Sequence, residues 1–551
     1  MFFRVKPSGP RSYLQLVENF WDQGRTKQRV LLTLGRLDQL QQSGQLDSLL
    51  TSGARLSQKL LVLSAHHKGE APAIRTSCLG PALVFERLWR ETGCQAVVEQ
   101  LLRGRRFEFD VERAVFVSVL HRLCQSGSDR ACQRWKDDHV VDGADGLDLQ
   151  HFYRAMAWLG EELPAAQQQG SSKLVPRCTK DAIEEALFAR RRDLFTELEL
   201  VFFDTTSIYF EGAGGETLGQ YGHSKDHRPD ERQLVVGAVL DGEGRPICCE
   251  LWPGNTADVT TLIPIVDRLW RRFHLRRICI VADRGMISQS TINDLEEQGW
   301  PYILGARLRA QKEVREQVLA DRGRFRVVHG PRQHSKDPAP LKVKEVWVGE
   351  HRYVVCVNPE QVESDRAKRA AIVASLAEKL KQGDKSLVGN KGYRRYLKVE
   401  GQSHFAIDES KLAEEERYDG TWVLRTANTE LATAEVALQY KKLWQVEHWF
   451  RDGKSLLDTR PIWHRRDETI RGHVFCSFLA LLLKQELQAR LEQKGHEFEW
   501  ADVMRDLERL QYVHVEHQDK RFLLRTEVQG TAGRVLQAAG VAVPPTVQQL
   551  P

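Results

Sequence analysis

Two aspartates follow strongly apolar segments of the chain and could bind a metal ion. The run Leu198-Glu-Leu-Val-Phe-Phe leads into Asp204, and the run Ile278-Cys-Ile-Val-Ala leads into Asp283. Runs of this kind predict buried strands, and residues at strand ends face the crevice where ligands bind in an open α/β sheet. Two carboxylates in that crevice suit a hard cation such as Mg²⁺, which prefers oxygen ligands.

A third carboxylate, Glu447, lies on a helix predicted over residues 434–457. Steps of seven residues return to nearly the same helix face, so Tyr440, Glu447 and Lys454 share one stripe. Glu447 could complete a two-metal site, Lys454 could bind a phosphate and Tyr440 could contribute a hydroxyl or a stacking surface. Each acid also has an ordinary alternative, because the aspartates could be turn or cap residues and Glu447 could pair with Arg451.

The elements that must position these residues belong to a multidomain α/β chain. Short β-type runs predict a β-meander in residues 1–75, and helical periodicity predicts a helical module, a possible DNA-binding one, in 76–195. Residues 196–304 and 434–495 form a predicted core with a mixed sheet, in which three antiparallel strands, a crossover helix and a further strand follow one another. Residues 305–433 are predicted as a β-rich insertion, and residues 496–551 as a C-terminal tail with one helix near 501–510.

Basic charge is concentrated in the predicted insertion. The chain carries a net charge of only +5, but residues 307–345 sum to +6 and residues 361–400 to +5. Such a concentration is typical of a surface that meets a polyanion, although a solvated basic face without a partner is an equal alternative. The longest apolar run, residues 474–483, is too short for a membrane helix, and the N-terminus lacks signal-peptide features. We therefore expect a cytoplasmic protein without a membrane partner.

Several segments resemble the DDE transposases of bacterial insertion sequences, specifically the group marked by a Tyr-(2)-Arg-(3)-Glu-(6)-Lys pattern. Tyr440, Glu447 and Lys454 occupy the Tyr, Glu and Lys places, whereas Leu443 stands in the place of the Arg. Further similar blocks are Phe203-Asp-Thr-Thr-Ser, Val281-Ala-Asp-Arg-Gly-Met, Gly222-His-Ser-Lys-Asp-His-Arg-Pro-Asp and Pro253-Gly-Asn-Thr-Ala-Asp.

This resemblance implies a ribonuclease-H-like catalytic core with the long insertion between Asp283 and Glu447. It implies that Asp204, Asp283 and Glu447 bind two Mg²⁺ ions, with Mn²⁺ as a substitute. The implied activity is cut-and-paste transposition, in which the ends of an insertion element are cleaved, through a hairpin, and joined to target DNA. The implied partners are double-stranded DNA, as terminal inverted repeats and target, and a second subunit in a synaptic complex. Association with the nucleoid would follow.

The resemblance also indicates which side chains would contact DNA. Tyr440 and Lys454 would hold the end phosphate, and a tryptophan of the insertion would support a flipped base. The missing Arg could be replaced by Lys441, Lys442 or Arg451. The remaining candidates are Trp347 and Trp422 for that base, and Lys225, Arg228, Arg465 and Arg466 for phosphates.

Other interpretations stay open at this point. Asn255 and Asp258 could shape the metal crevice or cap the following helix, with the cap favoured for Asp258, and Arg471 could track the DNA backbone. Residues 474–491, together with 501–510 as a further candidate, are the expected dimer interface, although the same apolar faces could pack internally. A simple metal-dependent nuclease on the same fold is one alternative function. A catalytically inactive, transposase-derived DNA-binding protein is the other, because Leu443 departs from the pattern.

Overall fold

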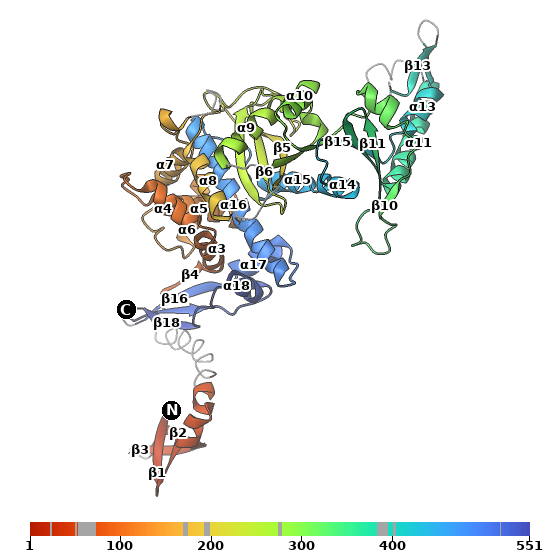
Figure 1. The fold of residues 1–551 in the computed structure, drawn as a ribbon. Helices are drawn as coiled ribbons and strands as arrows, with labels where there is room; N and C mark the ends of the chain where they lie inside the picture. The colour runs from red at the N-terminus through yellow and green to blue at the C-terminus, as the bar shows by residue number, and fades with distance from the viewer. Residues whose placement is uncertain are drawn as a thin grey trace. The chain divides into compact units, whose positions relative to one another are not determined.

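A computed structural model describes most of the chain in two compact units. The described residues are 1–22, 25–49, 52, 73–168, 175–191, 199–273, 278–382, 395–400, 404–517 and 520–550. The first unit comprises Met1–Ser77, Gln511–Glu527 and Pro544–Pro551, and the second comprises Cys78–Leu510 and Val528–Val543. Figure 1 labels their helices and strands.

The N-terminus forms the predicted β-meander. β1 (Phe2–Ser8), β2 (Arg11–Asp22) and β3 (Arg25–Arg36) pair antiparallel in that order, and α1 (Leu37–Gln42) follows. Gly9 supplies the positive φ of 59° that the tight turn between β1 and β2 requires. The three-stranded sheet confirms the β-meander expected near the start of the chain, whereas residues 53–72 of the predicted region 1–75 lie outside the described residues.

The C-terminal residues contain strands that the sequence did not predict. A second sheet in the first unit has the order β18-β17-β16-β4, with its members at β18 (Val547–Leu550), β17 (Lys520–Arg525), β16 (Gln511–His517) and β4 (Ala73–Cys78). Only the helix expected near 501–510 is confirmed, as α17 (Trp500–Glu508), and α18 (Ala532–Ala539) follows it in the second unit. The predicted tail is therefore a folded part of the protein.

The second unit begins with the predicted helical module. Asp110 caps α5 and Ser128 caps α6, each by accepting a hydrogen bond from a backbone N–H of the first helical turn. The helices are α3 (Gly80–Glu91), α4 (Cys94–Leu102), α5 (Val111–Cys124), α6 (Asp129–Asp137), α7 (Leu149–Leu159), the 3₁₀ turn η1 (Ala165–Gln167) and α8 (Thr179–Arg191).

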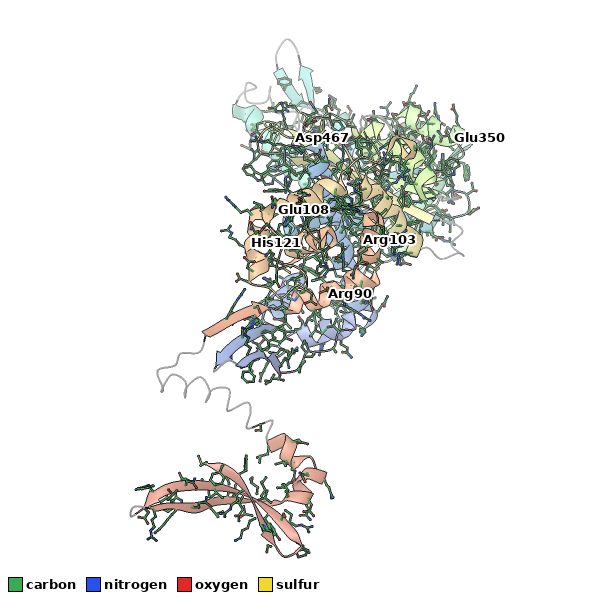
Figure 2. The ribbon with its side chains drawn as sticks, turned by 90° about the vertical axis from the view of Figure 1, so that its left-hand side faces the viewer. Arg90, Arg103, Glu108, His121, Glu350 and Asp467 are labelled. Atoms are coloured by element: carbon green, nitrogen blue, oxygen red, sulfur yellow. The ribbon has the colours of Figure 1, made fainter. Side chains whose placement is uncertain are left out.

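The long helix α16 (Asp467–Gln493) packs against α5 and α7 of this module. Asp467, labelled in Figure 2, lies at the start of α16 and accepts hydrogen bonds from the backbone N–H groups of Glu216 and Thr217. Nearly every apolar side chain of α16 is buried within the second unit. The expectation that residues 474–491 form a dimer interface is therefore wrong, because this helix is a core element.

A mixed nine-stranded sheet lies at the centre of the second unit. Its order is β10-β11-β12-β15-β9-β8-β5-β6-β7. β5 pairs antiparallel with β6 and parallel with β8, and β8 pairs parallel with β9. This confirms the predicted mixed sheet. The strands of this half are β5 (Glu199–Tyr209), β6 (Gln233–Leu240), β7 (Pro246–Pro253), β8 (Ile278–Ala282) and β9 (Tyr302–Gly305).

The two faces of this half-sheet have different neighbours. Phe203, Ala282 and Leu304 belong to an apolar cluster with the helices α9 (Leu262–Phe273) and α10 (Gln289–Glu297). Successive side chains of a strand point to opposite faces, so the residues that follow these three point to the other face. That second face is contacted by α14 (Thr433–Lys441) and α15 (Trp444–Arg451).

The predicted β-rich insertion extends this same sheet. It supplies β10 (Arg326–His329), β11 (Leu341–Val348), β12 (His351–Val357) and β15 (Thr421–Thr426), and β15 pairs antiparallel with β9. The predicted boundary at 304/305 therefore falls inside β9. The insertion also contains the long charged helix α11 (Pro359–Gln382), next to the hairpin of β13 (Leu397–Glu400) and β14 (His404–Ile407) and to α13 (Glu409–Glu416).

A buried ionic cluster joins the helical module to the sheet. Arg272 of α9 lies 2.6 Å from Glu184 of α8 and 2.7 Å from Glu250 of β7. Lys180 and Asp181 complete the cluster at 2.8 Å from one another. Buried charges are tolerated when they are paired and hydrogen-bonded, so this cluster fixes α8 against the sheet. No helix among the described residues is long and apolar enough to cross a membrane.

Candidate active site

Asp204 and Asp283 lie side by side on neighbouring parallel strands. In the register of β5 and β8, Phe203 is opposite Ala282, so the next residue of each strand is an aspartate. Residues opposite one another in adjacent strands point to the same face, about 5 Å apart. Contrary to the sequence prediction, β5 does not end at Asp204, because the strand continues to Tyr209; it is β8 that ends before Asp283.

The carboxyl group of Asp204 is held in a partly desolvated position. Burial raises its pKa to about 6, the charge of Lys225 opposes that rise, and the charges of Asp283 and Asp258 add to it. The backbone N–H of Thr205 donates to Asp204 Oδ1 at 2.7 Å. A buried carboxylate with other acids nearby is more easily ionised when a cation binds, and this fits a divalent ion held by oxygen ligands.

Lys225 and Asp258 form a polar network beside Asp204. Lys225 Nζ donates to the backbone oxygen of Thr205 at 2.7 Å and lies 3.0 Å from Asp258 Oδ2. The Thr205 hydroxyl donates to Asp258 Oδ1 at 2.8 Å. The predicted cap role of Asp258 is wrong, since its carboxylate binds Thr205 and Lys225. Lys225 is engaged with protein groups rather than free for a phosphate.

The predicted helix 434–457 is broken near its middle. α14 ends at Lys441, α15 begins at Trp444, and a π-helical segment, η6 (Asp452–Leu456), follows α15. Tyr440, Glu447 and Lys454 therefore lie on three different segments. Tyr440 still reaches the aspartates, because its hydroxyl donates to Asp283 Oδ1 at 2.9 Å. Burial and the nearby Asp283 raise the pKa of Tyr440, so the hydroxyl stays protonated.

Glu447 lies on the solvent-exposed side of α15. α15 itself packs against β5, the strand that carries Asp204. Within the described part of the chain, however, no three His, Cys, Asp or Glu side chains are grouped closely enough to hold one metal ion. The structure thus brings Asp204, Asp283 and Tyr440 together, and it leaves the Glu447 side chain outside that group. Trp444 lies one turn earlier on α15, and 56% of its surface is exposed. This tryptophan was not among the candidate site residues predicted from the sequence.

Leu443 is buried at the break between α14 and α15, with 6% of its surface exposed. The neighbouring lysines are engaged elsewhere: Lys442 Nζ donates to the Gly242 backbone oxygen at 3.3 Å, and Lys441 lies over the Trp422 ring at 5.7 Å. Of the three replacements considered for the missing Arg, only Arg451 is exposed.

Lys454 is paired with a carboxylate of the Gly222–Asp230 block. Its Nζ donates to Asp226 Oδ1 at 2.8 Å, and Arg460 binds the same oxygen. Burial lowers the pKa of Lys454, and Asp226 opposes that effect. The sequence did not identify Asp226 or Arg460, because their roles depend on segments more than two hundred residues apart.

The other residues predicted to contact DNA differ in exposure and in whether they form ion pairs within the protein. Arg465 and Arg466 are exposed. Arg228 pairs with Asp230 and Glu231. Arg471 is buried beside Glu162, so the suggestion that it tracks DNA is wrong. Of the two insertion tryptophans, Trp347 is 52% exposed on β11, whereas Trp422 is partly covered by Lys441.

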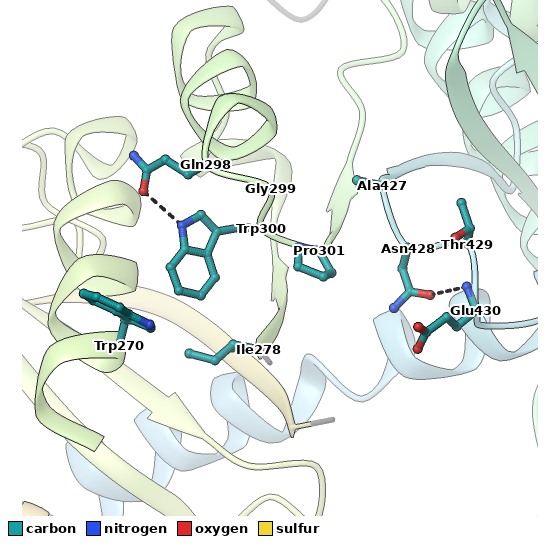
Figure 3. A pocket seen from close by; sticks show the side chains of 10 residues that line it. All are labelled: Trp270, Ile278, Gln298, Gly299, Trp300, Pro301, Ala427, Asn428, Thr429 and Glu430. Carbon is teal, nitrogen blue, oxygen red and sulfur yellow. Dashed lines mark hydrogen bonds between the residues drawn. The ribbon is translucent and has the colours of Figure 1, made fainter. Parts of the chain in front are cut away.

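A cavity lies at a different place on the large sheet, away from the two aspartates. The cavity has a volume of about 490 Å³, and Trp270, Trp300 and Ile278 are among the residues that line it (Figure 3). Ile278 is the first residue of β8, so the cavity is at the opposite end of that strand from Asp283. It contains none of the predicted site residues and is not part of the candidate active site.

Comparisons with known proteins agree with this arrangement. Residues 196–483, more than half of the chain, match the family model "Transposase DDE domain". Residues 3–65 match the model "IS1634 family transposase, N-terminal domain", and neither model supports the narrower group defined by the Tyr-Arg-Glu-Lys pattern. A search among curated proteins finds no match.

A solved structure of the piggyBac transposase synaptic complex with hairpin DNA is similar at 12% identity. The similarity covers 78% of this chain and 79% of that one, with a TM-score of 0.39.

Proposed function

The chain belongs to the DDE transposase family, and from that premise we propose that Asp204, Asp283 and Glu447 are its catalytic carboxylates. Proteins of this family use divalent metal ions. We propose two Mg²⁺ ions, with Mn²⁺ as a substitute, held by Asp204 and Asp283 and completed by Glu447. When bound, the ions would activate the attacking oxygen and stabilise the leaving one.

One observation carries this proposal, namely the register that makes Asp204 and Asp283 adjacent on β5 and β8. It supports a ribonuclease-H-like core, in which β7, β6 and β5 run antiparallel and β8 and β9 run parallel to β5. The raised pKa of Asp204 adds support, since a carboxyl group that resists ionisation on its own gains most from a cation. Glu447 is proposed from its place on α15, which packs on β5.

The chain's own residues would prepare the site for DNA. Lys225 and Thr205 hold Asp258, and Lys225 partly compensates the charge of Asp204. Lys454 and Arg460 place two positive charges beside the site, and a DNA phosphate could share them with Asp226. We assign an end-phosphate contact to Lys454, and DNA-backbone contacts to Arg451, Arg465 and Arg466.

The edge of the large sheet provides a further basic surface. Arg322, Arg324 and Arg326 precede or begin β10 and are exposed. In the part of the chain that the structure describes, no carboxylate forms an ion pair with them. Trp347, two strands away from β15 in the sheet, is exposed on β11. We propose that this surface contacts double-stranded DNA in a synaptic complex of two subunits, where a hairpin intermediate could form.

The proposal is tested with DNA that carries the ends of the chain's own insertion element. Wild type with Mg²⁺ should cut at the element boundary and join the freed end to a target plasmid. Asp204→Asn should bind the same DNA without cutting it. Cutting without joining would favour a simple nuclease, and binding without cutting in wild type would favour an inactive DNA-binding protein.

A further inference from the structure

Gly305 lies in the same row as the two proposed metal ligands. β9 pairs parallel with β8 in a register that sets Leu304 opposite Ala282, so Gly305 follows opposite Asp283. Asp204 in β5, Asp283 directly after β8 and Gly305 at the end of β9 therefore occupy equivalent places in the register of three adjacent parallel strands, and side chains at such places point to the same face. Gly305 is the member of this row without a side chain.

The Tyr440 hydroxyl fills the space that a side chain at position 305 would take. A Cβ atom built on Gly305 would collide with Tyr440 Oη and would lie 3.2 Å from its Cζ. The obstacle is the end of a rigid ring that enters from α14, so it could yield only if the ring moved. Gly305 does not have a positive φ, which means that the need for glycine comes from this close approach and not from the backbone conformation.

The hydroxyl that occupies this space is bonded to Asp283 alone among the hydrogen bonds of the described residues. It donates to Asp283 Oδ1 at 2.9 Å. One carboxylate oxygen of Asp283 is thereby fixed by the phenol.

We propose that Gly305 and Tyr440 act together as positioning residues for Asp283. The absent side chain at Gly305 admits the phenol, and the phenol orients the carboxylate for metal binding. This assigns Tyr440 a role within the protein, in place of the DNA-phosphate contact that its position in the sequence pattern indicates. The inference rests on the proposed function, because it takes Asp283 to be a metal ligand.

The test is a calorimetric titration of the full-length chain with Mn²⁺, without DNA and at a temperature below the melting temperature of every variant. Groups that orient a metal ligand typically change metal affinity by about 10-fold to 100-fold. Tyr440→Phe should therefore weaken Mn²⁺ binding about 10-fold, and Gly305→Ala should weaken it at least as much. Gly146→Ala, at a position with no atom within 4 Å of the added Cβ, should bind Mn²⁺ as wild type does.

The double variant Gly305→Ala/Tyr440→Phe separates positioning from general loss of structure. Removal of the hydroxyl removes the collision and leaves only the contacts of the new methyl group with Cζ of the ring at 3.2 Å and with the Arg284 backbone nitrogen at 3.3 Å. The double variant should therefore melt above Gly305→Ala and bind Mn²⁺ no more weakly than Tyr440→Phe. The inference would be overturned if the double variant weakened Mn²⁺ binding by the product of the two single-variant factors, because the two residues would then act independently. Wild-type Mn²⁺ affinity in Tyr440→Phe together with weakened DNA binding would also overturn it, and would make Tyr440 a DNA contact.

Asp283→Asn distinguishes failure of this inference from failure of the proposed site. If Asp283→Asn loses Mn²⁺ binding while Tyr440→Phe and Gly305→Ala retain it, only the positioning role is wrong. If Asp283→Asn binds Mn²⁺ like wild type, Asp283 is not a ligand, and the proposed site and this inference both fail.

Discussion

Lys454 donates a hydrogen bond to Asp226 at 2.8 Å, across 228 residues of sequence. Only 6% of the Asp226 side chain is exposed, and Arg460 binds the same carboxylate oxygen. The pair fixes the Gly222–Asp230 block against the segment that follows α15. Lys454 is therefore positioned by a protein carboxylate before any DNA is present.

Removal of Asp226 should destabilise the protein strongly. Asp226→Ala leaves two largely buried cations, Lys454 and Arg460, next to one another without their shared acid. Loss of one partner from a buried ionic group typically costs about 3 kcal/mol. Urea denaturation should show this loss, whereas Asp230→Ala should change the stability much less, because its ion pair is exposed to solvent. An Asp226→Ala variant as stable as wild type would contradict the account.

The metal-free protein should become less stable as pH rises through the titration of Asp204. Its pKa is about 6 in the folded chain against an ordinary value of 3.8, so the folded state binds the proton more tightly. The stability that protonation contributes is present at low pH and is lost as pH rises from about 4 to about 6.

Asp204→Asn should therefore raise the melting temperature of metal-free protein at pH 8 and have little effect at pH 4. The gain at pH 8 corresponds to at most about 3 kcal/mol. Added Mg²⁺ should raise the melting temperature of wild type but not of the variant, because ligands stabilise the state that binds them. If the melting temperatures of wild type and Asp204→Asn differed by the same amount at pH 4 and pH 8, burial would not raise the pKa of Asp204.

Restoration of the missing arginine should harm the protein. Leu443 is buried, so Leu443→Arg would place a charged group in an apolar position without a partner. We expect a loss of at least about 2 kcal/mol in denaturant unfolding, together with lower cleavage. The matched variant Leu443→Met conserves volume and should cost less than about 1.5 kcal/mol. Increased cleavage by Leu443→Arg would mean that the side chain can reach solvent and DNA.

The contact between the helical module and α16 should depend on Gly472. A Cβ atom at this position would lie 2.7 Å from the Cα atom of Met156 in α7 and would collide with its carbonyl oxygen. Gly472→Ala should therefore lower stability by about 1–3 kcal/mol. Gly533→Ala, also in a helix but with only an ordinary contact of 3.5 Å, should match wild type or exceed it slightly. Equal stability of Gly472→Ala and wild type would mean that α7 and α16 separate easily.

The sequence predicted the two aspartates because an apolar run that ends in an acid is a local pattern. It also predicted the β-meander, the helical module and the mixed sheet, since each depends on short-range periodicity. The break at Leu443 was missed because a seven-residue spacing assumes an uninterrupted helix. The strand β16 was missed because its apolar residues alternate with polar ones over only a few positions, and β17 because its apolar run, Phe522–Leu524, is only three residues long.

Features of the site that depend on register could not be read from the sequence. Gly305 acquires meaning only when β9 is set beside β8 and the Tyr440 ring enters above it. Asp258 resembled a helix cap, and only the fold brings it to Thr205 and Lys225. These contacts are tertiary, and propensities that act over a few residues carry no information about them.

The most direct test of the account is Mg²⁺-dependent cleavage of element-end DNA by Glu447→Gln, measured beside Glu435→Gln. Both glutamates are exposed on neighbouring helices, so the two changes should affect folding equally little. We predict that Glu447→Gln binds the DNA but loses cleavage by at least about 100-fold, and that Glu435→Gln cuts like wild type. Wild-type cleavage by Glu447→Gln would contradict the proposed three-carboxylate site.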